Sequence, residues 1–500
     1  MSLRRVPRVA VLLSLSLTAL STLQAQFSPN EYQKRRAALL ASVPQGVVLA
    51  IGAREPAQDY MSFYQGPSFN YLTGFLEPDA ALLMVKTPQA TTTTIFVQPR
   101  DAAREVWTGS RMGVSGVQQR TGIAGRDVRD FLQVLDSLAA TPLPFYVIGD
   151  FPGEELGGEG SVLSTDQQLM LALRKRHPGL VVKIANGAVE QLRGTKSMSE
   201  LAMIRKAVDV TVMAQREAMQ ALEPGMNEFE LQALIEYTFR RNGADRPSFA
   251  SIVGSGPNGT TLHYNADDRF IDRNDLVVMD IGASYKGYAA DVTRSVPANG
   301  VYSAEQRAVY QIVRDAQAAA ERQAKLGAPA HLMTDSATAT LAAGLTRLGL
   351  IEAPAATYDC ELGGQAARCP QYMLYYMHGL GHGIGLEVHD PDQYYFAQKI
   401  APGSAFTIEP GIYVRADVLD VLPDTPANRA LAAKLRLTVQ KYRNVGVRIE
   451  DDYVATETGV EWISRAPREI DEIEALMKVP YTGPAKRNAA LVDSYRNPVP

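Results

Sequence analysis

Leu276-Val277-Val278-Met279-Asp280-Ile281 is an apolar run interrupted by one carboxylate, and Tyr288-Ala289-Ala290-Asp291-Val292-Thr293 repeats the pattern after a short turn. A turn centred on Tyr285 and Lys286 would place Asp280 directly opposite Asp291, with Cβ atoms about 4.5–5.5 Å apart. A loop longer by two residues keeps both on one face. Facing carboxylates among apolar residues repel each other unless a cation lies between them. The alternative, one carboxylate in solvent, suits a single aspartate better than two that meet by register.

A second chemical signal is a histidine cluster: three of the six histidines, His378, His382 and His389, fall within twelve positions. Glycines at 379, 381, 383 and 385 argue against a helix, so we expect an extended strand with His378 and His382 on one face. A lone histidine is usually a satisfied core or surface residue. This cluster favours a metal or proton-transfer site.

Two further carboxylates end predicted strands: Glu409 before Pro410-Gly411, and Glu450 two residues after Arg448. Taken alone, each is compatible with a capped strand end and a surface ion pair. Together, the four carboxylates and one imidazole carry a formal charge of −4, which two divalent ions would neutralise. An oxygen-rich set with one nitrogen suits manganese, and cobalt or zinc are also compatible.

These motifs, in this order, resemble those of the pita-bread-fold metallopeptidases, and within them aminopeptidase P (Xaa-Pro aminopeptidase). The motifs are Met279 to Gly282 with Asp291 to Arg294, His378 to His382 through Asp390, Ile408 to Gly411, and Arg448 to Asp452. The resemblance implies that the metal ligands are Asp280, Asp291, His382, Glu409 and Glu450, with Asp291 and Glu450 contacting both ions.

The same resemblance implies catalytic roles. Gly254-Ser255-Gly256 through His263-Tyr264 is similar to a family segment beside the scissile bond. His263 and His378 would then hydrogen-bond the substrate carbonyl and the tetrahedral intermediate. His389 would line the pocket near the proline ring, Arg448 would orient the carboxylates, and Glu409 would carry a proton from the attacking water to the leaving nitrogen.

The N-terminal part also resembles the aminopeptidase P N-terminal domain, through Tyr71-Leu72-Thr73-Gly74-Phe75 and Glu105-Val106-Trp107-Thr108-Gly109. In the family the Trp107 region reaches a neighbouring subunit's active-site mouth, which implies a homo-oligomer, a dimer or tetramer. The alternative for Trp107 is a core anchor. The resemblance covers about residues 28 to 477.

A chain of 500 residues is too long for one core, so two domains are expected. Short strand patterns such as Gly46 to Ile51 alternate with helical stretches across 27–190, which predicts an α/β domain. A capping box, Ser197 to Glu200, opens a long helix in 191–477, where helices precede mixed strands. With the resemblance, this part is predicted to be an α+β pita-bread domain with a curved antiparallel sheet. Residues 478–500 are predicted to form a loosely packed tail.

The first 26 residues predict a secretory signal peptide, with Arg4, Arg5 and Arg8 before an apolar run of about a dozen. The alternative is a buried N-terminal helix. We therefore expect an exported, periplasmic or secreted protein that is not membrane-bound after cleavage. In an oxidising compartment Cys360 and Cys369 are expected to pair, rather than remain buried thiols. The net charge of −4 without a basic stripe argues against nucleic acid as a partner.

The predicted activity is a dinuclear metal-dependent release of the N-terminal residue from peptides with proline second. Xaa-Pro dipeptidase shares these ligands, but the long N-terminal domain favours the aminopeptidase. A catalytically silent peptide-binding module is disfavoured because all five ligands are present. Methionine aminopeptidase normally lacks such a domain. Departures from the family are a longer segment at Thr357 to Pro370, an expanded Val414 to Tyr442, and Glu387 in place of aspartate.

Overall fold

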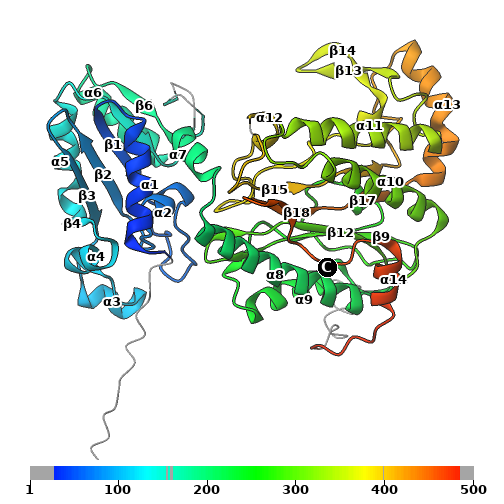
Figure 1. Ribbon diagram of the computed structural model, residues 1–500, viewed down its shortest axis with the longest axis horizontal. Helices are drawn as coiled ribbons and strands as arrows, with labels where there is room; N and C mark the ends of the chain where they lie inside the picture. Colours follow the sequence, from blue (N-terminus) through cyan, green and yellow to red (C-terminus); the bar gives the residue numbers. More distant parts are fainter. Residues whose placement is uncertain (1–26, 154–155, 158–161, 398, 485–500) are drawn as a thin grey trace, which may run out of the picture.

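The computed structural model describes residues 27–153, 156–157, 162–397 and 399–484 (Figure 1). The predicted signal peptide, 1–26, lies outside these ranges, and so does most of the predicted tail, 478–500. Both therefore stay predictions. Within the described ranges, no helix combines the length and the apolar character that crossing a membrane demands.

The N-terminal lobe is a six-stranded mixed sheet in the order β4-β3-β2-β1-β5-β6. Its strands are β1 (Gly46–Ile51), β2 (Ala81–Lys86), β3 (Thr91–Val97), β4 (Ala124–Asp127), β5 (Phe145–Ile148) and β6 (Val182–Ile184). Side chains alternate between two cores: Val48 and Ala50 of β1 face one, and Val47 and Leu49 the other. Burial on both faces explains why β1 is continuously apolar.

Helices cover both faces of this sheet, as an α/β domain requires (Figure 1). The first face carries α1 (Pro29–Ala41), α2 (Pro67–Thr73), α4 (Gly113–Thr121) and α7 (Asn186–Arg193), and the second carries α5 (Phe131–Ala139) and α6 (Thr165–Arg176). A short helix, α3 (Ala102–Thr108), lies at one end of the lobe, and the 3-10 turn η1 (Val128–Asp130) precedes α5.

Four long helices support the C-terminal lobe: α8 (Met198–Ala221), α9 (Glu228–Arg241), α10 (Ala304–Glu321) and α11 (His331–Leu348). The predicted capping box is confirmed at the start of α8, where Ser197 and Glu200 satisfy each other's backbone N–H. The same device opens α9 at Asn227 and α10 at Ser303. These polar caps fix where each helix begins.

The strands between these helices pair antiparallel, as predicted for this lobe. They form the groups β8-β9-β12, β7-β10-β11, β15-β18-β19 and β16-β17. Their bounds are β7 (Arg246–Pro247), β8 (Ile252–Ser255), β9 (Leu276–Ile281), β10 (Ala283–Tyr285), β11 (Tyr288–Ala289), β12 (Val292–Pro297), β15 (Ala405–Ile408), β16 (Gly411–Val414), β17 (Val445–Arg448), β18 (Asp451–Thr456) and β19 (Gly459–Trp462). The remaining elements are η2 (Asn258–Thr260), η3 (Gln371–Leu374), α12 (Tyr394–Ala397), α13 (Pro426–Tyr442) and α14 (Ile470–Met477).

The hairpin that carries both aspartates differs from the prediction in its register. Tyr285 pairs with Tyr288, so Lys286 and Gly287 form the turn, and Asp280 lies opposite Thr293 rather than Asp291. Both turn residues have positive φ, 50° and 83°, which is the two-residue turn that matches strand twist and is easiest when glycine is second. The prediction that Asp280 lies directly opposite Asp291 was wrong, but the two carboxylates stay on one face of the hairpin as diagonal neighbours.

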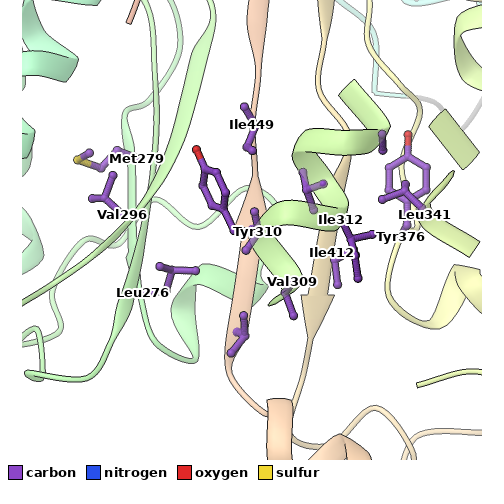
Figure 2. Close-up of a cluster of buried hydrophobic side chains, with 14 of the residues drawn as sticks. Leu276, Met279, Val296, Val309, Tyr310, Ile312, Leu341, Tyr376, Ile412 and Ile449 are labelled. Atoms are coloured by element: carbon purple, nitrogen blue, oxygen red, sulfur yellow. The ribbon is translucent and has the colours of Figure 1, made fainter. Parts of the chain in front are cut away.

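One hydrophobic core packs the strands against the long helices (Figure 2). Leu276, Met279 and Val296 of the β9–β12 pair lie on one side, and Tyr310 and Ile312 of α10 on the other. All five side chains are at most 4% exposed. The strands that bear the metal-type residues therefore stand on a rigid support.

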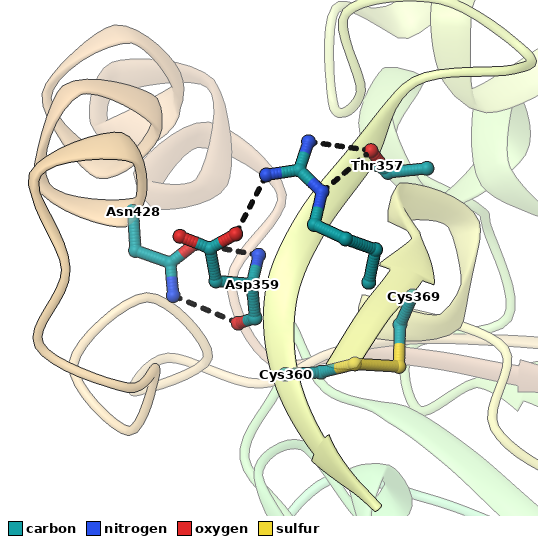
Figure 3. Close-up of a disulfide and its surroundings, with 6 residues drawn as sticks. Thr357, Asp359, Cys360, Cys369 and Asn428 are labelled. Atoms are coloured by element: carbon teal, nitrogen blue, oxygen red, sulfur yellow. Dashed lines mark hydrogen bonds and ion pairs between the residues drawn. A yellow bond between two sulfur atoms is a disulfide. The ribbon is translucent and has the colours of Figure 1, made fainter. Parts of the chain in front are cut away.

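The two cysteines are paired, as predicted, in a hairpin of β13 (Thr357–Leu362) and β14 (Gln365–Pro370) (Figure 3). The bond joins Cys360 to Cys369, residues on neighbouring strands with Cα atoms 5.8 Å apart. Asp359 and Asn428 of α13 exchange hydrogen bonds, so this hairpin is tied to the expanded segment before β17. The longer segment, 357–370, and the expanded segment, 414–442, are therefore joined in one structural unit.

Candidate metal centre and active site

The structure brings every predicted site residue to one cavity of about 570 Å³. Its lining includes Asp280, Asp291, His382, Glu409, Glu450, His263, His378, His389 and Arg448. These residues come from segments spread over almost 190 positions of chain. Apolar side chains complete the wall, among them Phe249, Ile252 and Leu262.

Each carboxylate stands at or beside the end of a strand. Asp280 is in β9, Asp291 directly precedes β12, and Glu409 directly follows β15. Glu450 lies between β17 and β18, where its N–H donates to Thr293 O at 3.1 Å and its Oε2 accepts from Thr293 Oγ1 at 2.7 Å. Strand ends hold the oxygens in place because the backbones behind them are fixed in ladders.

His382 stands at the centre of the acidic group. Its Nε2 lies 3.5 Å from Asp291 Oδ2, 3.6 Å from Glu409 Oε1 and 3.9 Å from Glu450 Oε1. Its Nδ1 is 3.0 Å from Gly383 O, so Nδ1 carries the proton and Nε2 turns its lone pair to the carboxylates. Ligand atoms of Asp291, His382 and Glu450 all lie within 4.8 Å of one another.

Three oxygens in this group have no hydrogen-bond partner among the described residues: Asp280 Oδ1, Asp291 Oδ1 and Glu450 Oε1. All three residues are at least nine-tenths buried. Buried carboxylate oxygens without donors are costly unless a cation meets them. Together with the free Nε2, they fit divalent metal, and a purely structural polar cluster would leave them unexplained.

The pKa directions agree with a site built for cations. Burial, then the charges of Glu450 and Asp280, raises the pKa of Asp291 well above its usual range. Burial followed by the charge of Asp280 raises the pKa of Glu450 to about 8. Burial, then the neighbouring His389, lowers the pKa of His382 to about 4. In the absence of a cation, the cavity thus favours the protonated, neutral form of the carboxyl groups and the neutral form of the imidazole.

One charge is compensated within the protein: Asp280 Oδ2 accepts from Arg448 Nη2. Arg448 also donates to Thr293 Oγ1 at 3.3 Å and to Tyr413 Oη at 2.8 Å. Arg448 therefore ties the aspartate hairpin to β16, and it holds one oxygen of Asp280 while the other stays free.

The histidine segment is not the strand we predicted. It is irregular backbone with a single bridge, from Gly383 to Phe406, although Thr407 N donates to His382 O and Ile384 N donates to Ala405 O beside that bridge. Gly383 bonds instead to the turn at Asp390 and Pro391, and the contact with β15 does not become a regular ladder. The expected close approach is present: a Cβ on Gly381 would meet Thr407 O at 2.5 Å. His378 and His382 still reach the same cavity, through loop geometry.

Two histidines are oriented by neighbours. His378 Nδ1 is 2.8 Å from Gly379 O and its Nε2 is 2.9 Å from Tyr413 Oη, and these two contacts fix the orientation of the ring. Burial lowers its pKa to about 3. The ring of His389 stacks on that of His382 with centroids 3.9 Å apart, and His389 Nδ1 donates to Asp392 Oδ1.

Sequence reasoning missed two buried glutamines that grip the ligand strands. Gln215 of α8 donates to the carbonyls of Met279 and Val292 at 3.0 and 2.7 Å. Gln317 of α10 donates to the carbonyls of Ile408 and Ile449, both at 3.3 Å. Each acceptor adjoins a carboxylate of the site. The available signal was a polar residue on the apolar face of a long amphipathic helix.

Comparison with known proteins is decisive on the family. Residues 202–457 match the model of metallopeptidase family M24, and residues 32–143 match that of the aminopeptidase P N-terminal domain. The chain belongs to metallopeptidase family M24. This chain is 33% identical over 467 residues to the Xaa-Pro aminopeptidase of Escherichia coli strain K12. The alignment covers 91% of this chain and 98% of the relative. The chain is 28% identical over 482 residues to human Xaa-Pro dipeptidase, with 89% and 92% covered.

Solved structures agree with this assignment. A zinc-substituted E. coli aminopeptidase P in complex with product matches with a TM-score of 0.72 at 29% identity, over 90% of this chain and 98% of that one. Pseudomonas aeruginosa aminopeptidase PepP matches with a TM-score of 0.73 at 31% identity, over 91% and 99%. The predicted fold class, an α/β N-terminal domain and an α+β pita-bread domain, is confirmed for this M24 enzyme, which is a metalloaminopeptidase.

Proposed function

We propose that this enzyme releases the N-terminal residue from peptides whose second residue is proline, with two divalent metal ions at Asp280, Asp291, His382, Glu409 and Glu450. The observation that carries the proposal is the convergence of all nine predicted site residues on one cavity, with three buried carboxylate oxygens unpaired among the described residues. The Xaa-Pro aminopeptidases among its relatives supply the substrate class.

Manganese is the proposed native metal, since four carboxylates and one imidazole form an oxygen-rich set. Cobalt and zinc suit the same donors. Such ions supply Lewis-acid polarisation of the scissile carbonyl and a nucleophilic water at neutral pH. The resemblance to the family is the ground for proposing that Asp291 and Glu450 would contact both ions, and both belong to the close ligand group with His382.

Three histidines are proposed to act on the peptide, and Arg448 to act through Asp280. His263 and His378 are proposed to hydrogen-bond the scissile carbonyl and the developing oxyanion, and His389 to line the proline pocket. Arg448 fixes Asp280, as its hydrogen bonds indicate. Glu409, whose Oε2 lies 3.7 Å from His378 Nδ1, is proposed to carry the proton to the leaving nitrogen.

Proline gives such a site a defined target. An Xaa-Pro bond is a tertiary amide without N–H, and the ring fixes φ, so enzymes that bind an extended backbone through that N–H lose a contact. The cavity lining also includes the apolar side chains Phe249, Ile252 and Val388, which suit a proline ring.

The test compares an Xaa-Pro-Yaa tripeptide with an Xaa-Pro dipeptide, using purified protein and added manganese. We expect tripeptide turnover that a chelator and the Asp291→Asn variant both abolish, while Asp130→Asn, an exposed carboxylate in the other lobe, leaves it unchanged. Turnover of the dipeptide alone would indicate the dipeptidase. Failure to cleave either peptide, with no bound metal, would refute the enzyme and leave a binding module.

We further propose a homo-oligomer, a dimer or tetramer. Trp107 on α3 is 78% exposed and its neighbour Val106 is 81% exposed, so the core-anchor alternative is wrong for the single chain. Two large exposed apolar side chains at one end of a lobe suit an interface with another subunit. Sedimentation of the wild type against Trp107→Ala tests this: an oligomer that the variant weakens is expected, and a monomeric wild type would refute it.

Export is proposed from the leader pattern of residues 1–26, and the disulfide between Cys360 and Cys369 supports it, since such bonds persist in oxidising compartments. N-terminal sequencing of the protein recovered from its native host is the check. A mature chain that starts near Gln26 or Phe27 is expected, and one that retains Met1 and stays in the cytoplasm would contradict the proposal.

A further inference from the structure

A second cavity lies in the N-terminal lobe, apart from the metal centre. It measures about 410 Å³ and opens beyond the carboxyl ends of the parallel strands β1 and β5, at Gly52 to Arg54 and Gly149 to Asp150. The chain leaves β1 toward β2 on one side and leaves β5 toward β6 on the other. Adjacent parallel strands whose connections diverge create the crevice where open α/β sheets bind ligands.

Two opposite charges, Asp166 and Arg54, lie side by side on the lining of this cavity. Asp166, at the start of α6, is 6% exposed, and its Oδ2 accepts from Asp150 N at 3.0 Å. Its Oδ1 forms an ion pair with Arg54 Nη2 at 3.7 Å, a separation longer than a hydrogen bond. The Arg54 side chain is half exposed, so it can turn to a ligand. Burial raises the pKa of Asp166, and the hydrogen bond from Asp150 N and the charge of Arg54 oppose that rise only in part.

The other charges narrow the ligand class. Arg193, also on this wall, already bonds Glu387, Asp390 and Ser68, so it offers no free guanidinium edge. Glu190 adds a further carboxylate to the lining. With one available cation among several acids, a phosphate ligand is disfavoured. In the described part of the chain, the only close group of metal-type ligands is the one at Asp291, so a divalent ion is disfavoured here as well.

We propose that this cavity binds a small zwitterion, a free α-amino acid, with its carboxylate on Arg54 and its ammonium group on Asp166. An α-amino acid carries these two charges on adjacent groups, which matches a guanidinium and a carboxylate that stand side by side. The carboxylate of Glu190, which also lines the cavity, attracts the ammonium group of the ligand. Because Arg193 and Glu387 lie on the same wall, the ligand would contact side chains that also hold the His389 loop.

Isothermal titration calorimetry of the full chain with L-alanine tests the site, with N-acetylalanine and alaninamide as probes that each lack one charge. We expect Asp166→Asn and Arg54→Gln each to weaken alanine binding at least about tenfold, the effect of losing one charge-assisted bond. Each single-charge probe should bind at least about tenfold more weakly than alanine. Arg54 is exposed, so its variant does not depend on refolding a buried site.

Two matched controls separate this cavity from the metal centre. Asp130→Asn, an exposed carboxylate of the same lobe, and His378→Ala, in the catalytic cavity, should leave alanine affinity unchanged within about twofold. The proposal is overturned if titration with alanine to concentrations well above the millimolar range shows no binding. It is also overturned if neither Asp166→Asn nor Arg54→Gln changes the affinity for alanine, or if His378→Ala abolishes alanine binding.

Discussion

At the scale of single residues, the buried acids of the metal centre make the protein's stability depend on pH when no metal is bound. The pKa of Glu450 rises to about 8, and those of Asp291 and Glu409 rise as well, each by burial first and by neighbouring carboxylates second. In an unfolded chain these acids titrate near 4. The folded state therefore binds more protons between about pH 4 and 8, and stability falls as the pH rises through that window.

We expect the thermal midpoint of the chelator-treated protein to decrease as the pH is raised from 5 to about 8. Excess manganese is expected to remove most of this decrease. Arg448 and Asp452 face the same group, but Arg448 stays charged throughout the window. Glu450→Gln should flatten the metal-free profile. Identical pH profiles with and without metal would contradict the expectation.

A second residue-scale prediction concerns Arg294, which is fully buried. Its guanidinium donates to Asp451 Oδ1 and to the carbonyls of Thr293 and Glu450, beside the metal ligands. Arg294→Met would leave Asp451 with one fewer cation in a dry site, so we expect a loss of about 3–5 kcal/mol in the free energy of unfolding. Denaturant titration measures it. Arg126→Met, which breaks an exposed pair, should cost less than about 1 kcal/mol, and an equal loss in both variants would refute the argument.

At the scale of elements, α8 and α10 each hold two of the chain segments that bear the carboxylates of the site. Each sends one glutamine to two strand carbonyls that adjoin carboxylate ligands, so each helix fixes the spacing of a ligand pair. Gln317 also donates to Asp451 Oδ2 at 2.9 Å. Helix packing thus sets the geometry of the metal centre.

We expect Gln317→Leu to weaken metal affinity about 10–100-fold, the usual effect of losing a group that orients ligands. Chelator competition at fixed pH measures this. Gln311→Leu, on the exposed face of the same helix, controls for the general effect of leucine in α10. If both variants bind metal as tightly as the wild type, the strands are positioned without the glutamine.

At the scale of the whole molecule, the two lobes meet at the loop that carries His389. Arg193, the last residue of α7, donates from Nε to Asp390 Oδ2 at 3.1 Å and pairs with Glu387, while Lys196 donates to Asp390 O. Asp390 is 2% exposed, and Arg193 is the cation bonded to its carboxylate. The N-terminal lobe therefore takes part in placing the loop that carries His389.

Arg193→Met should lower kcat/KM about 10–100-fold at saturating metal, because a displaced loop misplaces His389 and a shift near 1 Å can cost that much. Bound metal should stay at wild-type stoichiometry, which separates misplacement from loss of the centre. Arg205→Met, which breaks an exposed pair with Glu461, is the control. Equal activity in both variants would show that the lobes need not be joined here.

Local patterns were sufficient for much of the fold. Ser197 and Glu200 start α8 because a capping box is satisfied within four residues, and the apolar run at Gly46 becomes β1 because both faces of that strand are buried. The hairpin register and the histidine loop were missed for related reasons. Each depends on which of several close backbone arrangements the surrounding chain favours, and a four-residue window holds too little of that energy.

The sequence by itself determined the chemistry. Burying carboxylates and histidines at apolar strand ends costs free energy unless a cation binds them, so these residues indicate a metal site before the fold is known. Tertiary structure alone decided which atoms meet. The grip of Gln215 and Gln317, the link from Arg193 to Asp390 and the charged cavity beyond β1 and β5 join residues far apart in the chain. Such contacts arise from the packing of whole elements, and no periodicity along the chain encodes them.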